Sequence, residues 1–284
     1  MVRLTSLTIL RAAQCSPAET PTNPAAPASV SVAGYDGDIM EPFISRDGRT
    51  LFFNNRNDPP NATDIHWAVR QTDSPFSYRG KIAGANSAAL DGVPTVSAQG
   101  DFCFISTRSY AATLATVHCG VWAPDNVRSV NLQAEASPRI LGRVIFDIEL
   151  SALGGYAVIS DGMFTGGAVP VAADLRLARR GPTGTIQLDA GSDWQFATIN
   201  SPALEYAAGL AADGLTMCFT RLEAGSPSLW ITHRSDEAAA FETPARIPGI
   251  TGFVEACTFA PDGAIYFHRL RGGRYELQRA ETLR

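Results

Sequence analysis

The sequence has no excess of positive charge and almost no lysine. Its 28 acidic side chains outnumber its 23 basic ones, and Lys81 is its one lysine. A chain with this balance offers no broad cationic surface to hold phosphates at physiological salt, which argues against nucleic acid and anionic membrane as partners. No apolar run approaches the roughly 20 residues that a membrane-spanning helix needs. We therefore expect no transmembrane span.

The short motifs of several enzyme classes are also missing. The sequence contains no GxSxG, HExxH, phosphate loop or dinucleotide fingerprint, so nucleophilic hydrolysis and nucleotide chemistry lack support. Its five cysteines include no CxxC pair, which argues against a zinc site and a disulfide scaffold. Cys103 and Cys218 occupy similar places in apolar segments, which favours burial as small hydrophobic residues. In an exported protein, Cys103 and Cys119 could instead form a bridge across one hairpin.

What the sequence does contain favours an all-β domain. Apolar residues make up 45% of the chain and charged residues 18%, so a chain of 284 residues can bury a full core. The 25 glycines and 18 prolines are spread along its length, as expected when many tight turns separate short strands. This composition favours strands over helices.

The first 27 residues differ from the rest. A short apolar stretch leads to Cys15, and a tract rich in proline, alanine and threonine follows it. Such a tract cannot pack a core and is typical of a tether. We predict a disordered leader over residues 1–27, with either a lipoprotein-like signal and a lipid tether at Cys15 or a plain cytoplasmic tail, and one folded domain over residues 28–284. The first alternative places the protein in the periplasm or at the cell envelope, and the second places it in the cytoplasm.

A repeat runs through residues 28–284. Each copy has a half-apolar strand, a short turn that ends in glycine, an aromatic-rich strand and, in four copies, a closing arginine. The turn glycines are Gly48, Gly100, Gly154, Gly214 and Gly263. Their separations of 52, 54, 60 and 49 residues suit a unit of four strands, and periods of this length indicate a β-propeller. We predict about five four-stranded blades.

The last unit is one strand short. A third strand is expected over residues 274–280, and the chain ends at Arg284 soon after it. A three-stranded edge would leave backbone donors and acceptors unpaired. The β-prone stretch of residues 28–33, with the sequence ASVSVA, is well placed to add the fourth strand. We predict that this N-terminal strand closes the ring.

The first unit carries a recognisable pattern of residues. It has Ser45 shortly before Asp47-Gly48, then a Leu-x-Phe segment, then Arg56 and a later Asp-Ile pair. This pattern resembles the WD40-like (PD40) repeats of TolB-type propeller proteins, over about residues 40–284. The resemblance implies a propeller fold, in bacterial members often with a binding role. The third unit departs most, because Leu153 and Gly154 replace the Asp-Gly turn.

Acidic residues recur on or near every innermost strand, which in a propeller lines the central channel. They are Asp38, Glu41, Asp91, Asp147, Glu149, Glu205 and Glu255. Several carboxylates at one channel would repel each other, and a hard cation such as Ca²⁺ would offset them. Alternatively, two of them could act as the acid and base of a glycosidase, about 5–10 Å apart. The third alternative, which we favour, is that these acids belong to the fold and pair with arginines.

The closing arginines form a second recurrent set, which consists of Arg56, Arg108, Arg221 and Arg269. Because arginine holds carboxylates through two parallel hydrogen bonds, each could tie its blade to an acid of the next one. The same set could instead bind an anionic ligand on one face. Among the four histidines, His268 is the one candidate for acid–base chemistry.

The sequence leaves three functions open. The favoured interpretation is a non-catalytic extracytoplasmic propeller that binds a protein, peptide or glycan and needs no cofactor. The alternative is a hydrolase or lyase of a carbohydrate or lactone that uses the channel carboxylates, with Ca²⁺ as an optional cofactor. A purely structural module would show a broad exposed apolar patch.

Overall fold

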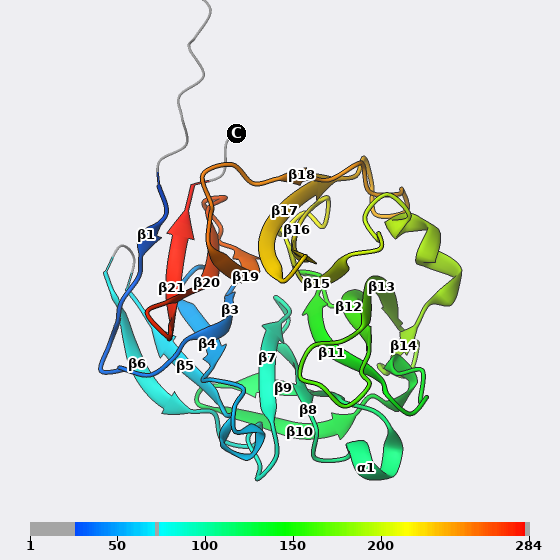
Figure 1. The fold of residues 1–284 in the computed structure, drawn as a ribbon. Helices are drawn as coiled ribbons and strands as arrows, with labels where there is room; N and C mark the ends of the chain where they lie inside the picture. The colour runs from blue at the N-terminus through cyan, green and yellow to red at the C-terminus, as the bar shows by residue number, and fades with distance from the viewer. Residues whose placement is uncertain (1–25, 72–73, 282–284) are drawn as a thin grey trace, which may run out of the picture.

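The computed structural model describes residues 26–71 and 74–281. Its strands follow the sequence repeat, and Figure 1 shows the strand groups arranged radially around a central axis. This is the arrangement expected of a β-propeller. Cys15 and residues 1–25 of the expected leader lie outside the described residues.

Each repeat unit is an antiparallel meander whose first strand is innermost. Unit one holds β3 (Met40–Ile44), β4 (Thr50–Asn54), β5 (Ile65–Val69) and β6 (Phe76–Lys81). Unit two holds β7 (Asp91–Val96), β8 (Asp101–Ser106), β9 (Val117–Ala123) and β10 (Asn126–Leu132). Unit three holds β11 (Arg143–Leu150), β12 (Tyr156–Met163), β13 (Ala172–Arg180) and β14 (Ile186–Leu188). Unit four holds β15 (Leu204–Leu210), β16 (Thr216–Glu223), β17 (Ser226–His233) and β18 (Ala245–Arg246).

The last unit takes its outer strand from the N-terminus. It holds β19 (Phe253–Phe259), β20 (Ile265–Arg271) and β21 (Arg274–Ala280), and β1 (Ala28–Ser29) pairs with β21 in antiparallel fashion. The next segment, β2 (Val32–Ala33), pairs with β6 of unit one. The predicted closing strand is therefore confirmed, and it joins the last unit to the first. Helical structure in the described part is limited to η1 (Pro60–Ala62), α1 (Tyr110–Thr113), η2 (Ala134–Ala136) and η3 (Ala190–Phe196).

Unit three forms a complete meander despite its altered turn. Gly154 adopts a positive φ of 70°, and a Cβ atom there would lie 2.7 Å from Asp101 Oδ2. Glycine is required at this position for both reasons. A single parallel bridge between Ala173 and Leu204 links units three and four into one eight-stranded sheet.

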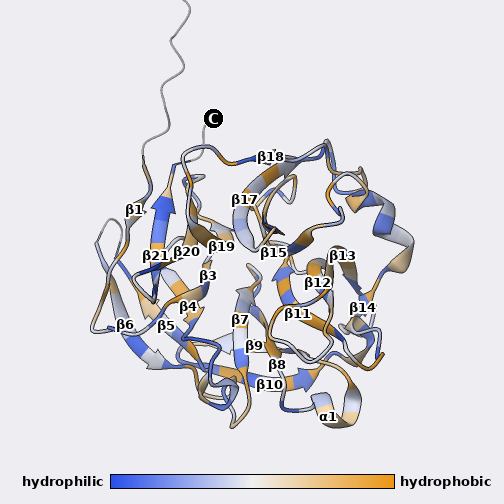
Figure 2. Cartoon of the chain, in the orientation of Figure 1, coloured by the Kyte–Doolittle hydropathy of each residue, from blue (hydrophilic) through white to orange (hydrophobic). Residues whose placement is uncertain are grey.

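The hydrophobic core consists of five clusters, each between successive units. Cys103 and Ile105 of unit two, for example, pack against Ile148 and Leu150 of unit three. A corresponding cluster joins unit five to unit one, with Tyr266 and Leu277 against residues of β3 and β4. Figure 2 shows hydrophobic residues along the strands around the ring. Burial between units therefore holds the ring together.

Every innermost strand contains a bulge near the axis. The pairing register shifts once in each of β3, β7, β11, β15 and β19. In four of these strands the bulged residue has a positive φ, at Glu41, Val93, Ala207 and Ala256. Non-glycine residues rarely adopt this conformation, so something must hold them there.

Hydrogen bonds from the preceding unit hold these bulges. The backbone N–H of Val93 donates to Asn54 Oδ1, that of Ala207 to Ser160 Oγ and that of Ala256 to Thr220 Oγ1. The N–H of Glu41 donates to His268 Nδ1 over 3.2 Å. The accepting side chains occupy matching places, five or six residues after the turn glycine of their units. We call these four contacts the bulge ring.

Two disulfides add covalent links. Cys103 and Cys119 are opposite residues of β8 and β9, so the predicted bridge is present. Cys218 of unit four is joined to Cys257 of unit five, so the expectation of a free buried thiol at Cys103 and Cys218 is wrong. The strands bring these sulfur atoms together, which spacing alone did not reveal.

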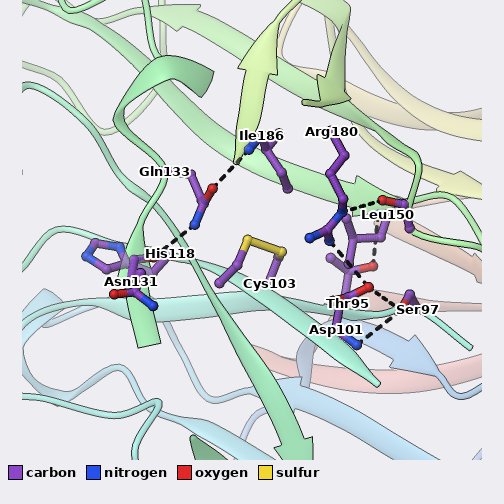
Figure 3. The surroundings of a disulfide bond; sticks show 12 residues. Thr95, Ser97, Asp101, Cys103, His118, Asn131, Gln133, Leu150, Arg180 and Ile186 are labelled. Carbon is purple, nitrogen blue, oxygen red and sulfur yellow. Dashed lines mark hydrogen bonds and ion pairs between the residues drawn. A yellow bond between two sulfur atoms is a disulfide. The ribbon is translucent and has the colours of Figure 1, made fainter. Parts of the chain in front are cut away.

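Polar contacts reinforce the boundary near the first bridge, between units two and three (Figure 3). The N–H of Ile186 donates to Gln133 Oε1, and the N–H of Leu150 donates to Thr95 Oγ1. The guanidinium of Arg180 lies 3.3 Å from Asp101 Oδ2.

The bulge ring predicts the effect of an isosteric substitution. Thr220→Val keeps the shape of a fully buried side chain but leaves the Ala256 N–H without an acceptor, which should cost about 1–3 kcal/mol of unfolding free energy. Thr220→Ser, which keeps the hydroxyl, is the matched control. Urea denaturation measures both, and a valine variant at least as stable as the serine variant would contradict this role.

Candidate functional site

The axis holds a small cavity lined by all five innermost strands. Its volume is about 20 Å³, room for a water molecule rather than a sugar ring. Five lining residues stand seven positions before the turn glycine of their units: Glu41, Val93, Asp147, Ala207 and Ala256. Two of these five equivalent positions therefore bring carboxyl groups to the axis, from units one and three.

Arg46 closes the opposite end of the axis, at the face that carries the turn glycines. It follows β3, and its guanidinium crosses to units three and four. There it donates to the carbonyl oxygens of Leu210 and Leu150 and to Glu149 Oε1. A ligand must therefore approach from the other face, where the innermost strands begin. We call that side the entry face.

Glu149 is an acid of the fold. Besides Arg46, its carboxylate accepts hydrogen bonds from Thr95 Oγ1 at 2.8 Å and from the N–H of Leu210. Burial raises its pKa, against the opposing effect of Arg46 and Thr95. These contacts join units one, two, three and four.

Two other predicted site acids belong to ion pairs at the entry face. Asp91 binds Arg108 at 2.6 Å, and Glu205 binds Arg221 at 2.7 Å. Ser87 and Ser201, each of which follows an asparagine, donate backbone and hydroxyl hydrogen bonds to the same carboxylates. Both acids are fully buried. They stabilise the loops that lead into β7 and β15.

Three of the arginines hold an acid of their own unit, and Arg56 also donates to the carbonyl oxygen of Gly273 in unit five. Arg56 holds Asp38 of the same unit at 2.8 Å, as Arg108 and Arg221 do with their acids. The predicted tie to an acid of the next blade is therefore wrong, because the second strand of each meander ends beside the start of its own first strand.

Arg269 differs from the other three. In unit four the pairing partner of Arg221 across the strands is Glu205, whereas in unit five the partner of Arg269 is Val254. Within the described residues, Arg269 has no ion pair, and its guanidinium lies 5.8 Å from the Phe267 ring centre. The acid of the repeat is missing in unit five.

Glu41 and Asp147 have no such partners. In the described part of the chain, neither carboxyl group has a hydrogen bond or an ion pair with arginine or lysine, and Asp147 is only 5% exposed. Burial, together with the charges of Asp147 and Glu255, raises the pKa of Glu41 to about 8 despite the opposing effect of His268. Burial and the charge of Glu149 raise the pKa of Asp147 well above its ordinary value.

Glu255, beside Glu41, has the opposite electrostatics. Its Oε2 lies 3.1 Å from His268 Nε2, and its Oε1 accepts the hydroxyl of Tyr206. Burial alone would raise the pKa of Glu255, but these two hydrogen bonds outweigh burial and lower it. The site thus places a protonated carboxyl group next to an ionised one.

His268 contacts the backbone of Glu41 and the carboxylate of Glu255. Its Nδ1 accepts the Glu41 N–H and its Nε2 faces Glu255, so a neutral ring with the proton on Nε2 satisfies both contacts. Burial lowers its pKa, but the hydrogen bond to Glu255 and the charges of Glu41 and Glu255 outweigh burial and raise it. His268 is the one titratable member of the bulge ring and is fully buried.

Sequence reasoning missed three residues of this site: Arg46, Tyr206 and Tyr275. The Tyr275 ring packs edge-on against His268 at 5.3 Å, and burial raises its pKa, with the charge of Glu255 adding to the effect. The sequence did contain a signal that Glu41 and Asp147 both reach the axis. Glu41 and Asp147 both stand seven residues before their turn glycines, whereas the ion-paired acids Asp91 and Glu205 both stand nine residues before theirs.

A Ca²⁺ site receives no support from this geometry. Among residues 26–71 and 74–281, no group of three or more His, Cys, Asp or Glu side chains is placed to hold a metal ion.

Across the same residues, no helix is long and apolar enough to span a bilayer.

No family model matches this chain, and its sequence matches no curated protein. Solved structures do share its fold. A thermostable family-43 glycoside hydrolase aligns with a TM-score of 0.59 at 10% identity, over 88% of this chain and 91% of that one. A family 117 glycoside hydrolase from the marine bacterium Zobellia galactanivorans aligns with a TM-score of 0.59 at 9% identity, over 90% of both chains.

A third similar structure is an α-L-arabinofuranosidase from Podospora anserina in complex with cellotriose. It aligns with a TM-score of 0.56 at 10% identity, over 92% of this chain and 98% of that one. At these identities the likeness shows the all-β propeller fold.

The raised pKa of Glu41 predicts how stability depends on pH. Between its ordinary value of 4.5 and about 8, Glu41 keeps a proton in the folded state that it loses in the unfolded state. Stability must therefore fall as pH rises through this window. The raised pKa values of Asp147 and His268 act in the same direction, and the lowered pKa of Glu255 acts only at acid pH.

Glu41→Gln removes this proton, so the variant should lose less stability than the wild type between pH 5 and pH 8 and be the more stable of the two at pH 8. Thermal unfolding across this range is the measurement. Parallel curves for the two proteins would contradict a raised pKa at Glu41.

Proposed function

We propose that this protein is a glycoside hydrolase that acts at the entry face of the axis, with Glu41 as general acid and Glu255 as general base. The observation that carries the proposal is the pair itself: adjacent carboxyl groups, one unpartnered and protonated, the other ionised and oriented by two hydrogen bonds. Glycoside hydrolysis needs two carboxyl groups in these two states.

The roles follow from the contacts. Glu41 gives its proton to the glycosidic oxygen as the bond from that oxygen to the anomeric carbon breaks. Glu255 takes a proton from the water whose oxygen forms the new bond to that carbon. His268 and Tyr206 keep the Glu255 carboxylate in one orientation. A half-buried carboxyl group with a pKa of about 8 remains protonated at neutral pH, as a general acid must.

The fold supports this assignment. A likeness to family-43 and family 117 glycoside hydrolases, and to an arabinofuranosidase bound to cellotriose, makes a glycan the ligand class to test first. We also infer that the five units are five blades, with β1 as the outer strand of the fifth. The resemblance to PD40 repeats stays a prediction about the family of this chain.

An extracytoplasmic location is part of the proposal. Two disulfides join buried cysteines, and such bonds persist in oxidising compartments such as the periplasm. The expected lipid tether at Cys15 would be consistent with that location.

Substitution of the two acids tests the activity. A panel of 4-nitrophenyl pentosides, hexosides and aminohexosides should contain at least one substrate for the wild type. Glu41→Gln and Glu255→Gln should then each lower kcat/KM by about 10²-fold or more, the usual contribution of a positioned acid or base.

Asp101→Asn is the control, because Asp101 pairs with Arg180 at the opposite face. Its kcat/KM should stay within a few-fold of the wild type, as expected for a residue outside the site. No hydrolysis of any glycoside by the folded wild type, or full activity in Glu41→Gln, would overturn the proposal.

A further inference from the structure

The axis has more carboxyl groups than cationic side chains to pair with them. Four carboxyl groups lie at or beside the cavity: Glu41, Asp147, Glu149 and Glu255. Arg46 is committed to Glu149, and His268 bonds to Glu255. Neither Arg46 nor His268 contacts Asp147, which is 5% exposed and faces a like charge at Glu149. Asp147 is therefore a buried acid without a counter-charge.

A buried carboxylate is unstable unless it is protonated or paired. In the free protein Asp147 is protonated, because its pKa lies well above its ordinary value. A bound cation would provide the second. The proposed chemistry uses Glu41 and Glu255 and leaves Asp147 without a role, although it occupies one of the five axis-facing positions.

The cavity restricts what that cation can be. About 20 Å³ admits one group of the size of water or ammonium. The other equivalent positions are Val93, Ala207 and Ala256, which add no charged or polar side chain. The described residues place no set of three metal ligands here. A primary ammonium group fits, because it is compact, carries three N–H donors and matches a small cavity lined by the carboxyl group of Asp147.

We propose that Asp147 binds a protonated primary amine of the substrate, so that the glycan cleaved at the entry face contains an amino sugar with a free amino group. This names a substrate class and rests on the proposed function, but amine binding can be measured without catalysis. The same charges disfavour uronates and sulfated sugars, which would add a negative charge to the site.

Binding an ammonium group must release protons. The positive charge favours the ionised form of Asp147, so its proton leaves as the amine enters. Glu149 and Glu255 also face the amine, but each of them already has a partner. Arg46 pairs with Glu149, and His268 is bonded to Glu255, so these two groups attract the amine less than Asp147 does. Proton release at neutral pH is thus a signature that a neutral sugar would lack.

Calorimetric titration of the full-length protein at pH 7 tests this, with glucosamine, N-acetylglucosamine, glucose and methylammonium as probes at constant ionic strength. Glucosamine and methylammonium should bind, and glucosamine should bind about tenfold or more tightly than its N-acetyl form, because acetylation removes the charge. The observed heat should change between phosphate and Tris buffers by the amount expected for proton release.

Asp147→Asn should weaken glucosamine binding by about tenfold or more and abolish the buffer dependence, since it removes a buried charge partner. Circular dichroism verifies that this variant is folded, and Asp147→Glu, which keeps the charge, should retain binding better. Asp101→Asn should bind as the wild type does. Equal binding of glucosamine, N-acetylglucosamine and glucose would overturn the inference. So would no binding of glucosamine, or displacement of glucosamine by Na⁺ as effective as its displacement by methylammonium.

The two proposals fail separately. Hydrolysis of neutral glycosides without preferential amine binding would overturn the amine site and leave the hydrolase. Amine binding that depends on Asp147, without hydrolysis of any glycoside in the panel, would support the amine site and overturn the hydrolase.

Discussion

The bulged innermost strands are the constraint on which the rest of this structure depends. A bulge turns one residue of each strand towards the axis, and in four strands that residue adopts a backbone conformation that only an external partner can maintain. The partner is a side chain of the preceding unit, so the ring closes through hydrogen bonds as well as through hydrophobic burial. The same bulges decide which side chains line the cavity.

Position along the innermost strand separates structural acids from chemically available ones. An acid at the start of the strand, such as Asp91, meets the arginine that ends the second strand and becomes part of the fold. An acid at the bulge, such as Glu41 or Asp147, lies beyond the reach of those arginines. Where unit five replaces a small polar acceptor by His268, the bulge ring gains a second contact to Glu255. One substitution in the repeat thus connects the fold to the proposed chemistry.

Much of the fold could be predicted because the repeat is visible in the turn glycines and aromatic strands. The third strands and the N-terminal closing strand agree with prediction, since each depends on local pattern and on edge pairing. The pairing of Cys218 with Cys257 could not be predicted. These cysteines are 39 residues apart in different units, and only the packing of those units brings their side chains together. In the site, the sequence identified the acids as a group. It did not reveal which of them pair with arginines and which remain without a partner. Arg46, Tyr206 and Tyr275 carry no sequence signal, because their roles arise from contacts across the axis.

The protonation state of Glu41 tests the central claim most directly. Side-chain carboxyl resonances of ¹³C-labelled protein, assigned by comparison with Glu41→Gln, report the titration of this group. The account predicts a midpoint at a pH of about 8, with Glu255 already ionised at pH 5. Titration of Glu41 near its ordinary pKa of 4.5 would show that the axial cavity does not hold a protonated carboxyl group, and the proposed general acid would be lost.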